Sequence, residues 1–383
     1  MMVPCVTAAT ARARHSWAHS ESDAARRLYG VRDQLLPRTF VDSRCGSPGL
    51  DVSYGGLVDG LKHVLPFIER TRTELVGGSS SRAHGAWRRN VSAWVVSEQR
   101  GPLVALGLYD SEVPVVSAPA TVVAPMRIRY VVHVKQRGTP GDMLPRRDRE
   151  KLRSGIRRFG WSLERDESSA GFDFFFDRMH VPTMVARHGD DEVHTESRDI
   201  ARHALFERGA LLFLRHEGER RAGLICRTDG ATVSFRLAGV LDGDSRHYSD
   251  SLQLGLYSLA LEWAAEQGAQ YVELSGSRPF VSEGLYQFKR KFRPEILLPF
   301  NHFRSKRLVL MVRQDTPEVR DWLVANPIIA IDGRQELRVL FFFDEERPKR
   351  EGIRWRCSGI AREEPVDLDR WLVGASIVQS RIV

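Results

Sequence analysis

Short apolar runs broken by turn residues mark the second half of the chain. Apolar runs at 211–214 and 222–226 and an alternating run at 232–238 are separated by Glu217-Gly218-Glu219 and by Asp229-Gly230. Both separators are typical of tight turns, and runs of this length joined by tight turns predict antiparallel strands. The pattern therefore predicts a three-stranded meander.

A helical pattern follows this meander. Residues 249–267 are apolar on most sides, so we expect a buried helix. Ser249 or Asp250 can cap its start, and Gly268 can close its end. The next apolar run, 271–274, predicts a strand. Because this strand returns after a helical crossover, we expect it to lie parallel to the third strand of the meander.

A second helical pattern covers residues 145–159. Pro145 suits a first helical turn, and Leu152, Ile156 and Phe159 fall on one face. The remaining faces carry seven cations and only two acids. The cations are Arg146, Arg147, Arg149, Lys151, Arg153, Arg157 and Arg158. A solvated basic face is one interpretation. The excess charge favours a phosphate contact instead, for which we choose Arg153, Arg157 and Arg158.

Patterns elsewhere are weaker. Residues 1–80 look poorly packed, and the Gly-, Ser- and Pro-rich stretch 43–60 predicts a loop. Between residues 81 and 137 four apolar runs predict a mostly β unit, with strands at 93–96, 103–106, 113–116 and 128–134. The first two of these strands would form a hairpin.

The regions on either side of the meander also carry patterns. Residues 171–208 predict two helices around Pro182. Further strands and a helix are expected in 306–345, where they would complete a sheet.

Length and composition limit the number of domains and the kinds of partner. The chain has 383 residues, which suggests two or three domains. Its net charge of +8 permits a nucleic acid, a nucleotide-linked donor or an anionic membrane face as partner, and a basic protein without such a partner is the other interpretation. No apolar run reaches the ~18 residues of a membrane helix, so we expect no transmembrane segment.

Cysteine and histidine usage indicates a reducing compartment without a metal. Cys5, Cys45, Cys226 and Cys357 show no paired spacing. His188 and His194 flank two acids, but His-Glu-x-x-His is absent, and we predict no metal. No signal-peptide core follows the first residues either, so we expect a cytoplasmic protein.

The densest chemistry lies between residues 275 and 293. Ser275-Gly276-Ser277-Arg278-Pro279-Phe280 follows the predicted strand, and Gly284-Leu285-Tyr286-Gln287-Phe288-Lys289-Arg290-Lys291-Phe292 comes next. A polar turn with cations at the end of a strand is where α/β proteins place their chemistry. The alternative is a solvated basic turn whose aromatic residues belong to the core.

Residues 145–310 resemble GNAT-fold N-acyltransferases of the Fem-like branch, which includes the peptidyl transferases that add amino acids from aminoacyl-tRNA. The resemblance rests on the basic helix ending at Gly160, on 176–189, and on the 276–292 stretch. In Fem-like enzymes a Phe-Lys pair lies at the acyl-transfer site, and the pair here is Phe288 and Lys289. Arg293 stands where those proteins usually have glycine.

The resemblance implies an α/β (α+β) fold of tandem GNAT-like domains, with mixed sheets and flanking helices. Residues 1–140 would be a degenerate copy with a frayed start, 141–310 the acyltransferase domain, and 311–383 an extension completing the sheet. In this fold the third meander strand and the strand after the helix diverge, and the gap exposes backbone groups that can hold a donor's amide-rich arm.

The same resemblance guides the choice of site residues. Lys289 would stabilise developing negative charge, with Phe288 desolvating it and Arg278 as a fixed fork for a phosphate or carboxylate. We expect Glu273, Ser275, Ser277, Tyr286, Lys291 and Arg293 to bind substrate. Glu273 could serve as a base, although a plain ion pair is the stronger interpretation. No Ser-His-Asp or Cys-His set is evident, which argues against a covalent acyl-enzyme.

These features favour direct transfer of an acyl or aminoacyl group onto a small-molecule amine. The donor would be acyl-CoA or aminoacyl-tRNA, with no tightly bound cofactor and no DNA partner. The CoA phosphate signature is absent from 246–251, whereas the basic helix suits tRNA. Two alternatives stay open: an aminoacyl-tRNA-dependent ligase of cell-wall or specialised-metabolite synthesis, and a non-catalytic RNA-binding or scaffold protein.

Overall fold

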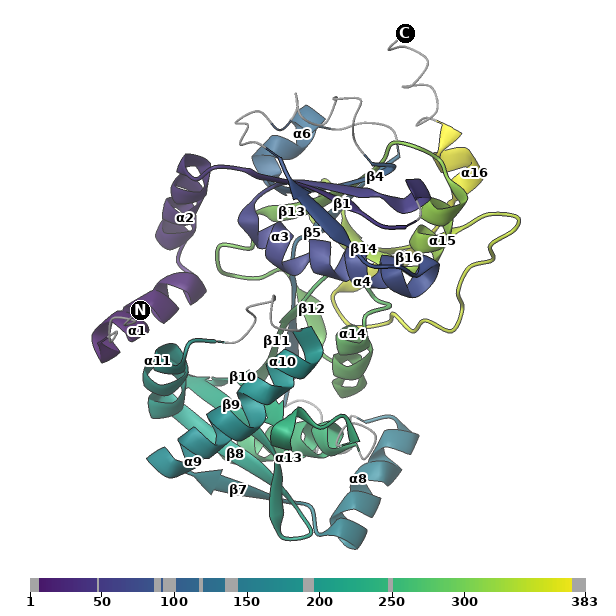
Figure 1. Ribbon diagram of the computed structural model, residues 1–383. Coiled ribbons are helices and arrows are strands. Elements are labelled where there is room, and N and C mark those ends of the chain that lie inside the picture. The colour runs from purple at the N-terminus through teal and green to yellow at the C-terminus, as the bar shows by residue number, and fades with distance from the viewer. Residues whose placement is uncertain are drawn as a thin grey trace. The chain divides into compact units, whose positions relative to one another are not determined.

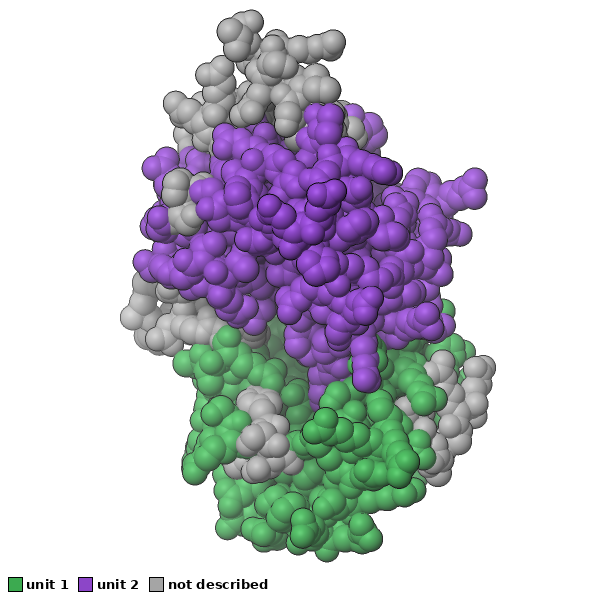
Figure 2. Space-filling model, turned by 90° about the vertical axis from the view of Figure 1, so that its right-hand side faces the viewer, with its two compact units in different colours: residues 1–19, 129–275, 289–295 green, residues 20–128, 276–288, 296–383 purple. Residues whose placement is uncertain are grey.

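The chain folds into two compact α/β units with mixed sheets, in agreement with the predicted fold class. The structure is a computed structural model that describes residues 7–46, 48–85, 91, 101–116, 120–134, 144–188, 196–246 and 251–373. Unit 1 comprises residues 1–19, 129–275 and 289–295, and unit 2 comprises 20–128, 276–288 and 296–383 (Figure 2). The units interleave along the sequence, whereas the predicted boundaries at 140 and 310 separate consecutive segments. That division stays a prediction.

Unit 1 is built on a seven-stranded sheet of order β12-β6-β11-β10-β9-β8-β7 (Figure 1). The predicted meander is present and antiparallel throughout. As predicted, β11 runs parallel to β10. The strands are β6 (Ile128–His133), β7 (Ser162–Asp166), β8 (Gly209–His216), β9 (Glu219–Asp229), β10 (Thr232–Val240), β11 (Tyr271–Ser277) and β12 (Glu295–Leu297).

The two helices predicted with most detail in unit 1 are α13 (Leu252–Glu266) and α8 (Arg146–Phe159). The predicted caps of α13, Ser249 and Asp250, lie outside the described residues. The predicted contact face of α8 is partly wrong, because Ile156 and Phe159 are exposed while Leu152 and Gly155 are buried.

Glycine explains how α8 packs. A Cβ atom added to Gly155 would lie 2.2 Å from the Trp161 ring, and one added to Gly255 of α13 would lie 2.6 Å from it. Trp161 is buried. The indole therefore fills space that the two glycines leave open, which periodicity of apolar residues alone does not reveal.

The two helices predicted around Pro182 each contain a π-helical turn. The first consists of α9 (Ser169–Phe175), η3 (Phe176–His180) and α10 (Val181–His188). Proline lacks an N–H group, and the wider turn before it absorbs the missing hydrogen bond. The second helix and the N-terminal helix complete this list: α11 (Arg198–Ile200), η4 (Ala201–Leu205), η5 (Phe206–Arg208) and α1 (Ala8–His19).

The two faces of the sheet in unit 1 have different covers. Phe235 packs edge-on against Tyr257 of α13. Leu211, Phe213 and Ile225 instead pack with residues of α9, η3 and η4. Since side chains alternate along a strand, α13 covers one face, and the helices after β7 cover the other.

Unit 2 holds a six-stranded sheet of order β3-β1-β2-β4-β13-β5. An antiparallel pair, β1 with β2, is followed along the chain by two helices, by β3 and by β4, which is parallel to β2. The strand expected at 308–312 lies between β4 and β5. The elements are α2 (Asp23–Leu35), β1 (Thr39–Arg44), β2 (Val52–Gly56), α3 (Val58–His63), α4 (Leu65–Val76), β3 (Ser81–His84), β4 (Leu103–Tyr109), β5 (Thr121–Pro125) and β13 (Lys306–Val312).

The expectation of a poorly packed start and of a loop at 43–60 is wrong. Residues 52–56 form β2, and all five are buried. Gly56 has a φ of 119°, and a Cβ atom there would lie 2.1 Å from the Gly107 carbonyl oxygen. The glycines that suggested a loop serve a close approach between two strands.

Three further strand predictions have different outcomes. The strand at 93–96 lies outside the described residues, so its hairpin is untested. Residues 113–116 are helical, because the Glu112 carboxylate accepts the Tyr109 N–H at 2.8 Å and starts a helical turn. The strand predicted at 128–134 exists as β6, but it belongs to the sheet of unit 1.

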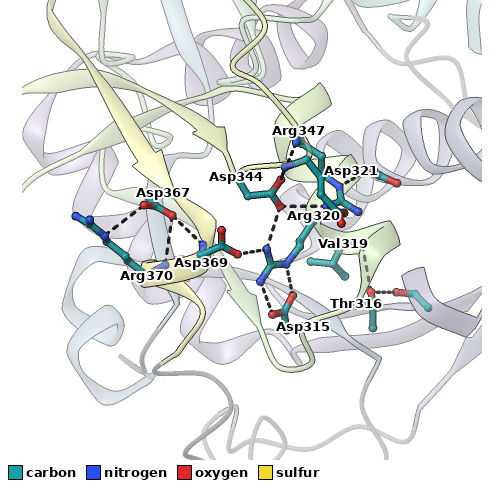
Figure 3. Close-up of polar contacts among 12 residues, drawn as sticks. Asp315, Thr316, Val319, Arg320, Asp321, Asp344, Arg347, Asp367, Asp369 and Arg370 are labelled. Carbon is teal, nitrogen blue, oxygen red and sulfur yellow. Dashed lines mark hydrogen bonds and ion pairs between the residues drawn. The ribbon is translucent and has the colours of Figure 1, made fainter.

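An arginine network joins the ends of several elements of unit 2 (Figure 3). Arg320 of α15 contacts Asp315 at 2.7 Å, Asp344 at 2.9 Å and Asp369 at 2.5 Å. Burial raises the pKa of Asp344, but hydrogen bonds and charge from Arg320 and Arg347 outweigh it and leave that pKa lowered. The remaining elements are α15 (Pro317–Ala325), β14 (Ile328–Ile331), β15 (Leu337–Phe343), β16 (Ile360–Asp367) and α16 (Leu368–Trp371).

We predict that Gly56→Ala destabilises unit 2 by more than about 2 kcal/mol, through both the clash and the positive φ. Urea unfolding measures this loss. Gly30→Ala is the matched control, since a Cβ atom at Gly30 in α2 meets nothing within 4 Å. It should stabilise the helix by about 0.5–1 kcal/mol. Equal stability of Gly56→Ala and the natural protein would contradict the role assigned to Gly56.

Candidate active site

The parallel strands β10 and β11 separate after three residue pairs. Thr232 is in register with Tyr271, Val233 with Val272 and Ser234 with Glu273, which is the last pair. Yet β10 continues to Val240 and β11 to Ser277. The structure thus contains the divergence that the GNAT resemblance implied, and we call it the β10–β11 opening.

The corresponding parallel pair in unit 2 stays closed. There β2 and β4 are in register over five pairs, from Val52 with Leu103 to Gly56 with Gly107. Backbone groups used in such a ladder are not available to a ligand. A third parallel pair, β15 with β16, also stays paired to the end of both strands, where Phe343 is in register with Asp367. Among the parallel pairs of the described residues, the one in unit 1 is therefore the candidate site.

Ser275 shapes the opening. Its φ is 60°, a left-handed conformation that is uncommon for residues other than glycine. Its hydroxyl donates to the Phe235 carbonyl across the opening, and its own carbonyl accepts from the Lys289 ammonium at 3.3 Å. Backbone strain of this kind concentrates at functional sites.

Lys289 ends α14 (Gly284–Lys289) and is only 2% exposed. Its Nζ lies 5.0 Å from the centre of the Tyr130 ring, in cation–π geometry. A cation with little access to water acts strongly on nearby charge. Sequence reasoning missed Tyr130, which resembles any other aromatic residue in a strand.

The residues after Lys289 are tied into unit 1. Lys291 forms an ion pair with Asp148 of α8 at 2.9 Å. Phe292 is fully buried and stacks with Tyr257 at 5.9 Å. Arg293 has a φ of 50°, so the turn keeps the conformation that glycine would favour.

Glu273 makes the expected ion pair. Its carboxylate lies 2.9 Å from the Arg129 guanidinium and accepts from the Ser234 hydroxyl at 3.2 Å. These contacts suit a structural carboxylate more than a free base.

Four other predicted site residues belong to unit 2. Arg278 pairs with Glu283 at 2.8 Å and donates to the His63 carbonyl. Its guanidinium, predicted to bind a phosphate or carboxylate, therefore already has partners within the protein. The other three are Ser277 and Tyr286, which were predicted to contact substrate, and Phe288, which was predicted to desolvate Lys289. Ser277 donates to the Arg278 carbonyl at 2.9 Å, Tyr286 donates to the Trp355 carbonyl at 2.5 Å, and Phe288 lies in α14.

The basic helix α8 presents its arginines to solvent. Arg153, Arg157 and Arg158 are exposed, and none forms an ion pair with a residue that the structure describes. Within the described ranges, no group of three His, Cys, Asp or Glu side chains is arranged to hold a metal. Nor does any described helix combine the length and apolar character that crossing a membrane requires.

Comparison with known proteins finds counterparts among solved structures. No protein-family model and no curated protein matches the chain. FemX is similar at 9% identity and a TM-score of 0.38, over 58% of this chain and 74% of that one. A GCN5-related N-acetyltransferase from Sphaerobacter thermophilus is similar at 12% identity and a TM-score of 0.34, over 79% and 92%.

A third similar structure is the C-terminal domain of a putative lysylphosphatidylglycerol synthetase from Agrobacterium fabrum. Its identity is 14% and its TM-score 0.37, over 80% of this chain and 93% of that one. The solved structures that are similar to this chain thus include FemX and a GCN5-related N-acetyltransferase.

We predict that Arg293→Gly is more stable than Arg293→Ala by about 1 kcal/mol. Both substitutions remove the guanidinium, so their difference isolates the strain of the left-handed backbone at this position. Thermal unfolding of the two variants measures it. Equal stabilities would mean that the turn relaxes without cost.

Proposed function

We propose that the chain is an N-acyltransferase that moves an acyl or aminoacyl group directly from its donor to an amine. The observation that carries the proposal is the β10–β11 opening with the Lys289 ammonium buried beside it. An opened parallel pair leaves backbone donors and acceptors for a ligand, and a shielded cation can stabilise charge that develops there.

The reaction needs little else from the protein. A neutral amine attacks the donor's carbonyl carbon, the C–N bond forms, and the C–S or C–O bond to the leaving group breaks. The amine loses a proton, and the leaving group gains one. Lys289 would stabilise the oxyanion or the departing oxygen or sulfur, and Tyr130 would keep its ammonium in place.

The edge of β10 offers a place for the donor's amide groups. Val240 exchanges hydrogen bonds with the Thr183 hydroxyl, its N–H at 2.9 Å and its carbonyl at 3.3 Å, so these groups point away from β9. Backbone groups alternate in direction along a strand, so those of Ala238 also point away from β9. The Ala238 carbonyl oxygen lies 3.4 Å from the His180 Nδ1 atom, which leaves the Ala238 N–H as the group that a donor carbonyl would contact.

Two donors fit this site, acyl-CoA and aminoacyl-tRNA. The exposed arginines of α8 favour tRNA, because exposed cations on one helix suit a phosphate backbone. Amino-acid ligation in cell-wall or specialised-metabolite synthesis would then be the physiological role. The competing non-catalytic proposal predicts RNA binding without transfer from any donor.

We predict that Lys289→Met lowers kcat by about 10²–10³, because a preorganised cation acts on the transition state. The KM for the acceptor should change less than about threefold. Transfer from charged total tRNA and from acetyl-CoA to a panel of amines measures both constants. Lys62→Met is the control, because Lys62 is an exposed lysine of α3.

Lys289→Arg keeps the charge and serves if Lys289→Met does not fold. It should retain more turnover than Lys289→Met or any other neutral substitution. A folded Lys289→Met variant with unchanged turnover would refute the role of the lysine. Salt-sensitive RNA binding without transfer by the natural protein would favour the non-catalytic alternative.

We predict that changing Arg153, Arg157 and Arg158 together to Gln weakens tRNA binding at least about tenfold at 0.15 M salt and lowers the salt slope by about 2. A binding titration at several salt concentrations measures both. The control changes the exposed Arg334, Arg350 and Arg354 of unit 2 to Gln, which alters the net charge equally. An equal loss of tRNA affinity in both variants would mean that the basic face of α8 is merely solvated.

A further inference from the structure

A row of charged side chains crosses the sheet of unit 1 at its last closed step. Ser234 of β10 is in register with Arg227 of β9 on one side and with Glu273 of β11 on the other. Arg129 of β6 extends the row through its ion pair with Glu273. Residues in register present their side chains on the same face, so this row lies on the face opposite α13.

Arg236 stands at the end of this row, at the β10–β11 opening. Phe235 pairs with Cys226, but Leu237 pairs with Ile225, so Arg236 is the extra residue of a β-bulge. Bulges redirect a side chain and are common beside active sites. The Arg236 side chain reaches His15 of α1, with its Nη2 atom 3.5 Å from the His15 Nε2 atom.

Arg236 differs from the other two arginines of this group in its ion pairing. Arg227 pairs with Asp229 at 2.8 Å, and Arg129 pairs with Glu273. Within the part of the chain that the structure describes, Arg236 makes no ion pair, and His15 is its only polar contact.

His15 cannot balance this charge. It is only 3% exposed, and its Nδ1 atom lies 2.8 Å from Arg227. Burial first, and then Arg236 and Arg227, lower the pKa of His15 to about 4, so the ring is neutral near pH 7.

The more distant carboxylates do not pair with Arg236 either. Burial lowers the pKa of Arg236, while Glu273 and Glu196 oppose that change from beyond ion-pair distance. Burial also raises the pKa of Glu196. A partly buried cation left without a partner is costly and favours a ligand that supplies the missing charge.

We propose that Arg236 and the row beside it form a subsite for an anionic group, a carboxylate or a phosphate, carried by the amine acceptor. The identification of the ligand as the acceptor rests on the proposed acyl transfer. Lys289 contacts Tyr130, whose side chain alternates with that of Arg129, so the lysine and the row lie on opposite faces. The leaving group would sit beside Lys289, and the acceptor would enter from the Arg236 face.

Spacing limits what the acceptor can be. Arg236 is one residue from Phe235, whose carbonyl spans the opening to Ser275. One residue of strand advances about 3.3 Å. The anion would thus lie within a few bonds of the reacting amine, as in an amino acid, a short peptide or a phosphorylated amine.

Anion binding to the full chain tests the subsite without any donor. Inorganic phosphate and N-acetylglycine are titrated by calorimetry, at fixed ionic strength, into the natural protein, Arg236→Met and Arg221→Met. Arg221 is the control, since it lies in β9 and pairs with Glu219 at 2.5 Å. We expect one or both anions to bind the natural protein and Arg221→Met alike, and Arg236→Met at least tenfold more weakly.

The choice of anion identifies the ligand's chemistry. Preference for N-acetylglycine indicates a carboxylate, and preference for phosphate indicates a phosphorylated acceptor. Ligand-free Arg236→Met should melt no lower than the natural protein, because the substitution removes a charge that forms no ion pair with any described residue. Arg236→Lys, which keeps the charge but loses the fork, serves if Arg236→Met does not fold, and should bind more weakly than the natural protein.

Two outcomes would overturn the subsite: equal affinity of the natural protein and the Arg236 variant, or no anion binding at all. The result is separable from the transfer assay. If anions bind in an Arg236-dependent way but the protein shows no transfer activity, the subsite stands and the acyltransferase proposal is rejected. If the protein transfers acyl groups but shows no such anion binding, the acyltransferase proposal stands and the subsite is rejected.

Discussion

The early end of one strand pair governs everything proposed for this protein. A parallel ladder uses its backbone groups internally, and only where β10 and β11 part after Ser234 and Glu273 do such groups become available. Neighbouring interactions hold the two strands in this arrangement. Ser275 adopts a left-handed backbone, its hydroxyl bridges to Phe235, and Lys289 binds its carbonyl. The strain at Ser275 persists because these contacts determine its position.

The two units show what this divergence changes. Both contain an antiparallel pair followed by helices and a parallel strand. In unit 2, Gly56 and Gly107 let the parallel strands approach closely to the end of their register. In unit 1, a bulge at Arg236 and the turn at Ser275 force them apart. A similar order of elements therefore gives a closed parallel pair in unit 2 and an opening in unit 1.

The sequence predicted the meander, the crossover helix and the parallel strand well, because these depend on local turns and periodicity. The prediction failed where contacts between residues far apart in the sequence determine the secondary structure or the position of a strand. Residues 52–56 look like a loop until β4 lies against them. The position of β13 depends on Lys306, which is fully buried between Asp33 and Asp59, more than 240 residues earlier in the chain. No local pattern reveals that pairing.

The candidate site was predictable to a similar extent. The motif located Lys289 and the segment around it, since a cation after a strand is a local signal. It could not reveal Tyr130, which matters only through its distance from Lys289. Nor could it show that Arg278 is already paired with Glu283. The Arg236 bulge was missed because a one-residue shift between β9 and β10 leaves no mark in composition.

A cation on each face of the opening has a chemical consequence for acyl transfer. Acyl transfer must hold an amine that is not protonated close to an electrophile, while a cation stabilises the oxyanion. A cation close to the amine favours its neutral form, because like charges disfavour protonation. Lys289 and Arg236 would both act in this direction from opposite faces. The acceptor's own anion, held by Arg236, would cancel part of that effect, so the balance between the two cations would set the pH range in which the amine reacts.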